Sequence, residues 1–115
     1  MEGINSYKEH IIGEILKRIE KYKYISIFIF CGGLFGEITA ELLCNMHFAV
    51  SGIIENNKIY KDHVFREIKY YPPSILKHNN NCLILICNQR DKNFFDIKKQ
   101  ILQINKNNII ERITY

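Results

Sequence analysis

The stretch Ile25-Ser-Ile-Phe-Ile-Phe-Cys-Gly-Gly-Leu-Phe-Gly-Glu-Ile-Thr-Ala-Glu-Leu-Leu43 decides the fold of this chain. Its first six residues are apolar on both faces of a strand apart from Ser26, which is typical of a buried parallel strand. Four apolar residues then recur at helical spacing and predict a helix: Phe35, Ile38, Leu42 and Met46. The turn between strand and helix, residues 31–36, contains three glycines. Glycine-rich turns at this position hold phosphate groups in many α/β proteins.

Strands and helices alternate along the rest of the chain. Further strands are predicted at residues 48–54, 68–70, 82–87 and 109–113, and helices at residues 72–77 and 91–105, the second capped by Asp91. The polar segment 56–66 is predicted to be a loop with some extended pairing. Such alternation predicts an α/β fold, a three-layer Rossmann-like parallel sheet of about five strands in the order 3-2-1-4-5. In that order Cys31 and Cys87 end neighbouring strands, and Glu55 lies on the other side of Cys31.

An additional helix is predicted before the first strand, from about Tyr7 to Lys21. Ser6 and Glu9 have the spacing of a capping box, and five apolar residues form a stripe at helical spacing: Ile11, Ile12, Ile15, Leu16 and Ile19. Two interpretations of this helix stay open. It covers one face of its own sheet, or it binds a larger partner protein or a second copy in a homo-oligomer. We expect residues 1–115 to form a single Rossmann-like domain, with residues 1–22 as the N-terminal helix and residues 24–115 as the α/β core.

The composition is that of a globular protein. Of the 115 residues, 47% are hydrophobic and 24% are charged, which fits one domain with one core. The net charge of +4 comes from scattered lysines, so we expect no nucleic-acid partner. We expect a cytoplasmic protein with no membrane partner, because the sequence shows neither a secretory signal nor an apolar run of transmembrane length. The four cysteines and four histidines lack metal-ligand spacing, so no metal site is predicted.

The glycine turn partly matches the dinucleotide-binding fingerprint G-x-G-x-x-G. In Cys31-Gly32-Gly33-Leu34-Phe35-Gly36, Gly33 and Gly36 match the second and third glycines, and Cys31 replaces the first. Glu55 stands where the fingerprint places an acid that binds a ribose hydroxyl. Three more residues near strand ends complete the candidate cofactor site: Asn56, Asn88 and Arg90. The alternative is that the glycines serve only turning and close packing.

No arrangement of nucleophile and base is visible, so no catalytic residue is predicted and enzymatic activity stays open. Cys31 and Cys87 are packed thiols or a redox pair. Arg90 meets a phosphate or is a solvated loop residue. Tyr60 and His63 belong to a loop that closes over a ligand or lies on the surface.

The residues from Phe30 to Leu43 and the stretch Val50-Ser-Gly-Ile-Ile-Glu-Asn-Asn57 resemble the amino-terminal Rossmann-like domain of bacterial polysaccharide-biosynthesis proteins. That domain occurs in sialic-acid-type sugar O-acyltransferases and in nucleoside-diphosphate-sugar dehydratases. Gly33, Gly36, Gly52, Ile54 and Asn56 match its motifs, and Glu55 replaces its usual aspartate. Tyr71-Pro-Pro-Ser-Ile-Leu76 resembles its proline-led short helix. The resemblance covers the chain from about Tyr24 onward and leaves out the first helix.

The resemblance implies a module that binds a nucleotide or sugar nucleotide, such as NAD or a UDP-sugar, in surface polysaccharide synthesis. It does not extend to the catalytic parts of those proteins, so no complete active site is expected within these 115 residues. One alternative is a non-catalytic interaction or scaffolding domain with a degenerate nucleotide pocket. S-adenosylmethionine-dependent methyl transfer is a third class, since it shares a glycine turn and a strand-end acid.

Overall fold

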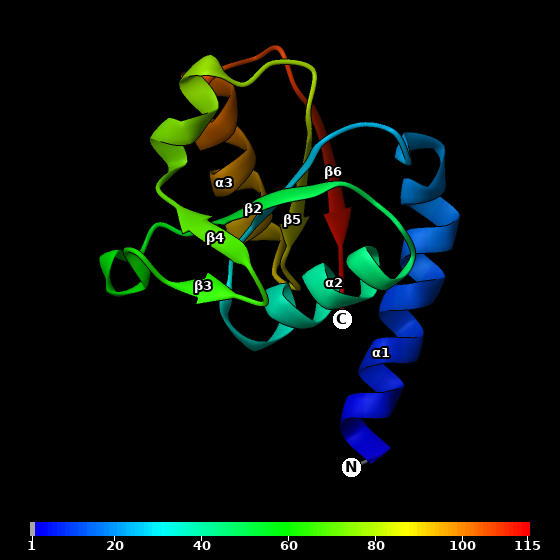
Figure 1. Cartoon of the computed structure of the whole chain (residues 1–115). Helices are drawn as coiled ribbons and strands as arrows, with labels where there is room; N and C mark the ends of the chain where they lie inside the picture. The colour runs from blue at the N-terminus through cyan, green and yellow to red at the C-terminus, as the bar shows by residue number, and fades with distance from the viewer. Residues whose placement is uncertain (1) are drawn as a thin grey trace.

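The central strand of the sheet, β1 (Ile27–Phe30), is buried along its whole length. It lies between β2 (Val50–Ile54) and β5 (Leu83–Cys87) and pairs with both in parallel. The computed structural model describes residues 2–115, and Figure 1 shows the sheet with helices on both of its faces. Because β1 is covered on both faces and paired at both edges, it needs the apolar sequence Ile-Phe-Ile-Phe that its residues supply.

The complete strand order is β3-β4-β2-β1-β5-β6. The outer strands are β3 (Val64–Phe65) and β4 (Ile68–Tyr71) at one edge and β6 (Ile109–Ile113) at the other. Every pair is parallel except the short β3–β4 hairpin. The five parallel strands confirm the predicted 3-2-1-4-5 order, and β3 is a sixth strand formed from the end of the predicted loop. The Rossmann-like α/β fold is therefore confirmed.

Two helical layers enclose the sheet. The helix α2 (Gly33–Asn45) shares one buried cluster with the N-terminal helix, and α3 (Asp91–Ile104) shares the other with the 3₁₀ turn Pro73–His78. Arg90 is the N-cap of α3 and Asp91 is its first residue, so the predicted Asp91 cap is wrong by one position. The 3₁₀ turn begins at the second proline of the Pro72-Pro73 pair, where a missing backbone N–H costs nothing.

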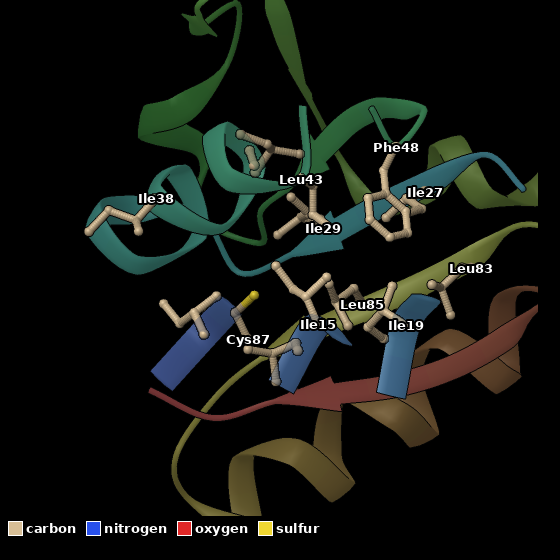
Figure 2. Close-up of a cluster of buried hydrophobic side chains, with 14 of the residues drawn as sticks. Ile15, Ile19, Ile27, Ile29, Ile38, Leu43, Phe48, Leu83, Leu85 and Cys87 are labelled. Carbon is tan, nitrogen blue, oxygen red and sulfur yellow. The ribbon is translucent and has the colours of Figure 1, made fainter. Parts of the chain in front are cut away.

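The N-terminal helix covers its own sheet. It comprises α1 (Glu2–Glu14), a π-helical segment (Ile15–Ile19) and a 3₁₀ turn (Glu20–Tyr22). Ile11, Ile15 and Ile19 are each 0% exposed, and Figure 2 shows Ile15 and Ile19 beside β-sheet residues such as Leu85. These contacts support the first of the two interpretations, because the apolar stripe is used inside the chain.

The predicted capping box is wrong. Ser6 and Glu9 lie within α1, which begins at Glu2, so Ser6 is too far inside the helix to cap its first turn. None of the described helices is long and apolar enough to cross a membrane.

Candidate functional site

The candidate site lies at the carboxyl edge of the parallel strands, where β1, β2 and β5 end side by side. The last β1 residue, Phe30, pairs with Ile54 of β2 and with Ile86 of β5. Cys31, just after β1, and Cys87, the last residue of β5, therefore lie at neighbouring strand ends, and Glu55 follows the strand on the other side, as predicted. Open α/β sheets bind ligands at this edge, beside the point where the strand order reverses.

The turn from β1 to α2 is tight and partly strained. Cys31 has a φ of 81° and Gly33 has a φ of 75°, so both occupy the left-handed region that favours glycine. A Cβ atom at Gly36 would overlap the carbonyl oxygen of Cys31, so only glycine lets α2 pack this closely on the end of β1. The packing role predicted for Gly36 is thus supported. Cys31 keeps its side chain at the first fingerprint position by adopting a conformation that L-residues rarely take.

Two backbone amides of the glycine turn, those of Gly32 and Gly33, already have partners. Glu55 Oε2 accepts a hydrogen bond from the N–H of Gly32 at 2.8 Å, and its Oε1 accepts from the N–H of Asn56 at 3.1 Å and from that of Asn57 at 3.4 Å. The N–H of Gly33 donates to the hydroxyl of Tyr70 at 3.3 Å. Glu55 therefore holds the glycine turn and its own loop together, and the turn has an internal anion in place of a ligand.

Tyr70 is a residue of this site that the sequence interpretation missed. Its hydroxyl donates to Glu37 Oε2 at 2.8 Å, and its ring stacks on Tyr60 with centroids 5.0 Å apart. Nε2 of His63 lies 3.6 Å from Oε2 of Glu37. Burial, followed by the hydrogen bond to Glu37, raises the pKa of Tyr70, so this hydroxyl stays protonated and keeps donating. Tyr60 and His63 thus pack on the turn-side tyrosine, as a loop that covers a site would.

Two amides of the glycine turn are not free to bind a pyrophosphate group in this arrangement. The amides of Gly32 and Gly33 that would bind its oxygens donate to Glu55 and Tyr70. A Cβ atom on Gly32 would lie 2.5 Å from the Tyr70 ring, so the ring itself presses against the turn. Of the three glycines, Gly33 is the least crowded, since a Cβ atom on it would make an ordinary contact of 3.8 Å with Tyr60 Oη.

The other predicted site residues are spread along the same edge and have structural partners. Asn56 and Gln100 exchange two side-chain hydrogen bonds, which tie the end of β2 to α3. Asn88 Oδ1 accepts from the N–H of Arg90 and shapes the start of α3. Two members of the turn point elsewhere: Leu34 is 58% exposed, and Phe35 stacks on Tyr115 at 3.8 Å. Glu55 is therefore bonded to the turn, whereas the side chains of Asn56 and Asn88 bond residues outside it.

The two strand-end cysteines are protonated thiols. Burial, with a smaller effect of Glu55, raises the pKa of Cys31 to about 11. Burial raises the pKa of Cys87 to about 12, although a hydrogen bond with Thr39 lowers it in part. Redox and nucleophilic cysteines need the opposite shift, so these values favour packed thiols over a redox pair. Within residues 2–115 no group of three or more His, Cys, Asp or Glu side chains could hold a metal ion.

A cleft of about 780 Å³ adjoins the turn on the side of β2 and β4. Its walls are the ends of these strands, the 3₁₀ turn Lys58–Tyr60 and the segment that follows it. The charged and aromatic lining residues are Glu55, Lys58, Tyr60, Lys61, Asp62, His63, Lys69, Tyr70 and Tyr71. The volume is within the range of pockets that hold small molecules. We refer to this space as the lysine cleft. In the sequence, only the predicted loop at residues 56–66 pointed to this cleft.

The fold and the carboxyl edge of its sheet define a Rossmann-like α/β protein, and one solved structure matches this fold. It is the crystal structure of RSP, a Rex-family repressor, which matches with a TM-score of 0.60 at 12% sequence identity over 92% of this chain. The match covers 60% of the repressor chain, so this chain spans less than two thirds of it. No protein-family model and no curated protein matches the sequence. At this identity the likeness shows the fold alone.

Two expectations from the sequence are corrected by this comparison. The resemblance to polysaccharide-biosynthesis domains is wrong. The solved structure that shares this fold is a Rex-family repressor, and no family model or curated protein of polysaccharide synthesis matches the chain. The glycine and strand-end motifs that carried it belong to the Rossmann-like fold in general and do not distinguish its families. The exclusion of nucleic acid as a partner is contradicted too, because it rested only on scattered lysines and the solved structure that shares this fold is a Rex-family repressor.

Proposed function

We propose that this chain is a nucleotide-binding module that receives its ligand at the carboxyl edge of the sheet, next to Glu55. The observation that carries the proposal is the glycine turn between β1 and α2, joined by Glu55 to a cleft of about 780 Å³. The ligand would lie at the carboxyl edge of a parallel sheet, which is the edge at which open α/β sheets bind ligands. The fold shared with a Rex-family repressor is consistent with a nucleotide-binding domain of the Rossmann-like class.

The cleft has the chemistry that a nucleotide needs. Lys58, Lys61 and Lys69 offer positive charge for phosphate oxygens, and Tyr71 and Pro72 offer flat apolar surface for a base. Nucleotides, including dinucleotides such as NAD, are therefore the ligand class to test. No catalytic step is part of the proposal.

The test is a thermal-shift and calorimetry panel on the full chain with AMP, ADP, ATP, NAD, NADH and S-adenosylmethionine. A ligand that binds only the folded chain stabilises it by about 2.7 kcal/mol at a hundredfold excess over its dissociation constant. Saturable binding of at least one nucleotide, with a matching rise in melting temperature, is the expected result. Absence of any heat or shift at millimolar concentration of every compound would overturn the proposal.

A second candidate is a non-catalytic interaction domain whose nucleotide site is degenerate. The specific observation in its favour is that Glu55 and Tyr70 occupy the amides of Gly32 and Gly33. This candidate predicts that Glu55→Gln and Tyr70→Phe change stability without creating nucleotide binding. The same panel, repeated on both variants, separates the two candidates.

A further inference from the structure

The glycine turn is closed by the protein's own acceptors, and opening it is costly. Glu55 receives three backbone N–H groups, from Gly32, Asn56 and Asn57. A phosphate at the turn would have to displace this carboxylate and leave it without those donors. It would also lie close to a second carboxylate, because Glu37 is held at the turn by Tyr70. Like charges at short range repel, so the closed turn disfavours a phosphate on electrostatic grounds as well.

The neighbouring lysine cleft has the opposite electrostatic character. Its lining contains three lysines against two acids, Glu55 and Asp62, and the Glu55 carboxylate is already bonded to backbone amides. Across residues 2–115 the ion pairs involve other groups, and none includes Lys58, Lys61 or Lys69. Three lysines that take part in none of these ion pairs therefore line one cleft.

The residues on two sides of the cleft favour a ligand with one nucleotide unit near the lysines. Tyr70 and Tyr60, stacked on each other, stand between the cleft and Gly33. Tyr71 and the two prolines at the end of β4 form the opposite wall. A base that rests on this wall leaves its 5′ phosphate within the lysine cleft, whereas a second nucleotide would need the turn that Tyr70 closes.

We infer, resting on the proposed function, that this chain binds a mononucleotide whose phosphate contacts Lys58, Lys61 and Lys69, while the glycine turn stays closed by Glu55 and Tyr70. The glycine turn then positions Glu55 at the cleft and does not bind phosphate. The preferred ligand is a nucleoside monophosphate or diphosphate, and a dinucleotide gains nothing from its second half.

The test compares AMP, adenosine and NAD by calorimetry on the full chain and on three variants. Lys58→Ala and Lys61→Ala should each weaken AMP binding about fivefold, as expected for one exposed charge contact, and leave adenosine binding unchanged. Lys106→Ala is the matched control, since Lys106 lines a different pocket beside Ile25 and Asn107. AMP binding should weaken with rising salt, and NAD should bind no more tightly than AMP.

Amide chemical shifts in ¹⁵N spectra provide the second measurement. AMP should move the signals of residues 58–63 and leave those of Gly32 and Gly33 in place. If AMP or NAD instead moves the Gly32 and Gly33 signals and binds both lysine variants as tightly as the original chain, the phosphate lies at the turn. That result overturns this inference and leaves the proposed function standing. A chain that binds no nucleotide in either measurement overturns both.

Discussion

Replacing Gly36 with alanine tests the close contact between α2 and the end of β1. The added Cβ would overlap the carbonyl oxygen of Cys31 and lie 3.2 Å from its carbonyl carbon. Both are backbone atoms that no side-chain rotation can move, so the helix has to shift away from the strand. Overpacking of this kind costs about 3 kcal/mol of the free energy of unfolding. For a chain of this length such a loss lowers the melting temperature by roughly 10 °C.

Gly13→Ala is the matched control, because it makes the same chemical change on α1. A Cβ there meets nothing within 4 Å, and alanine is better in a helix than glycine by about 0.8–1.0 kcal/mol. The two variants should therefore change stability in opposite directions in urea unfolding followed by circular dichroism. Gly36→Ala within about 0.5 kcal/mol of the original chain would refute the reasoning, since ordinary surface substitutions stay within that range.

Three further predictions concern the turn and its cysteine. Cys31→Gly relieves the strain of a side chain at a φ of 81°, about 1–2 kcal/mol, while the entropy of glycine in the unfolded chain costs about 0.5–1 kcal/mol, so urea unfolding should show a gain of up to about 1.5 kcal/mol. A clear loss would contradict the strain. Iodoacetamide at pH 8 should modify the exposed Cys44 before Cys31, because the pKa of about 11 keeps the Cys31 thiol protonated at that pH. Mass spectrometry that shows Cys31 modified first would refute this. Tyr70→Phe should lower the free energy of unfolding by about 1–2 kcal/mol, because the Gly33 amide loses its acceptor. The hydroxyl of Tyr71 bonds no described residue, so the control Tyr71→Phe should cost less than half as much, and equal losses in urea unfolding would contradict the role of the Tyr70 hydroxyl.

The strands and their order could be predicted because burial on both faces leaves a strong pattern in sequence. The runs in β1 and β5 are continuously apolar, and their alternation with helices allows few topologies. The stripe of isoleucines on the N-terminal helix also predicted that this face is buried, although the stripe alone does not say what covers it. The start of this helix was not predicted correctly, because Ser6 and Glu9 have the spacing of a capping box but lie inside α1, which begins at Glu2.

The closure of the glycine turn could not be predicted because it depends on the register between distant elements. Tyr70 reaches Gly33 only because β4 pairs with β2, placing Tyr70 opposite Ile53. The alternation of buried Ile68 and Tyr70 marks this tyrosine as inward-facing, but not as the partner of a particular amide. Glu55 was predicted to bind a ribose hydroxyl, whereas its bond to Gly32 shows it acting on the protein itself.

The central position of β1 has a consequence for synthesis on the ribosome. One edge of β1 pairs with β2, which follows soon after it, but the other edge waits for β5, about 50 residues further along the chain. At translation rates of about 5–20 residues per second the wait lasts several seconds. During that time an unpaired apolar strand edge is exposed, which is a template for pairing with another chain. Nascent chains that stop before Leu83 are therefore the form of this protein that most needs a chaperone.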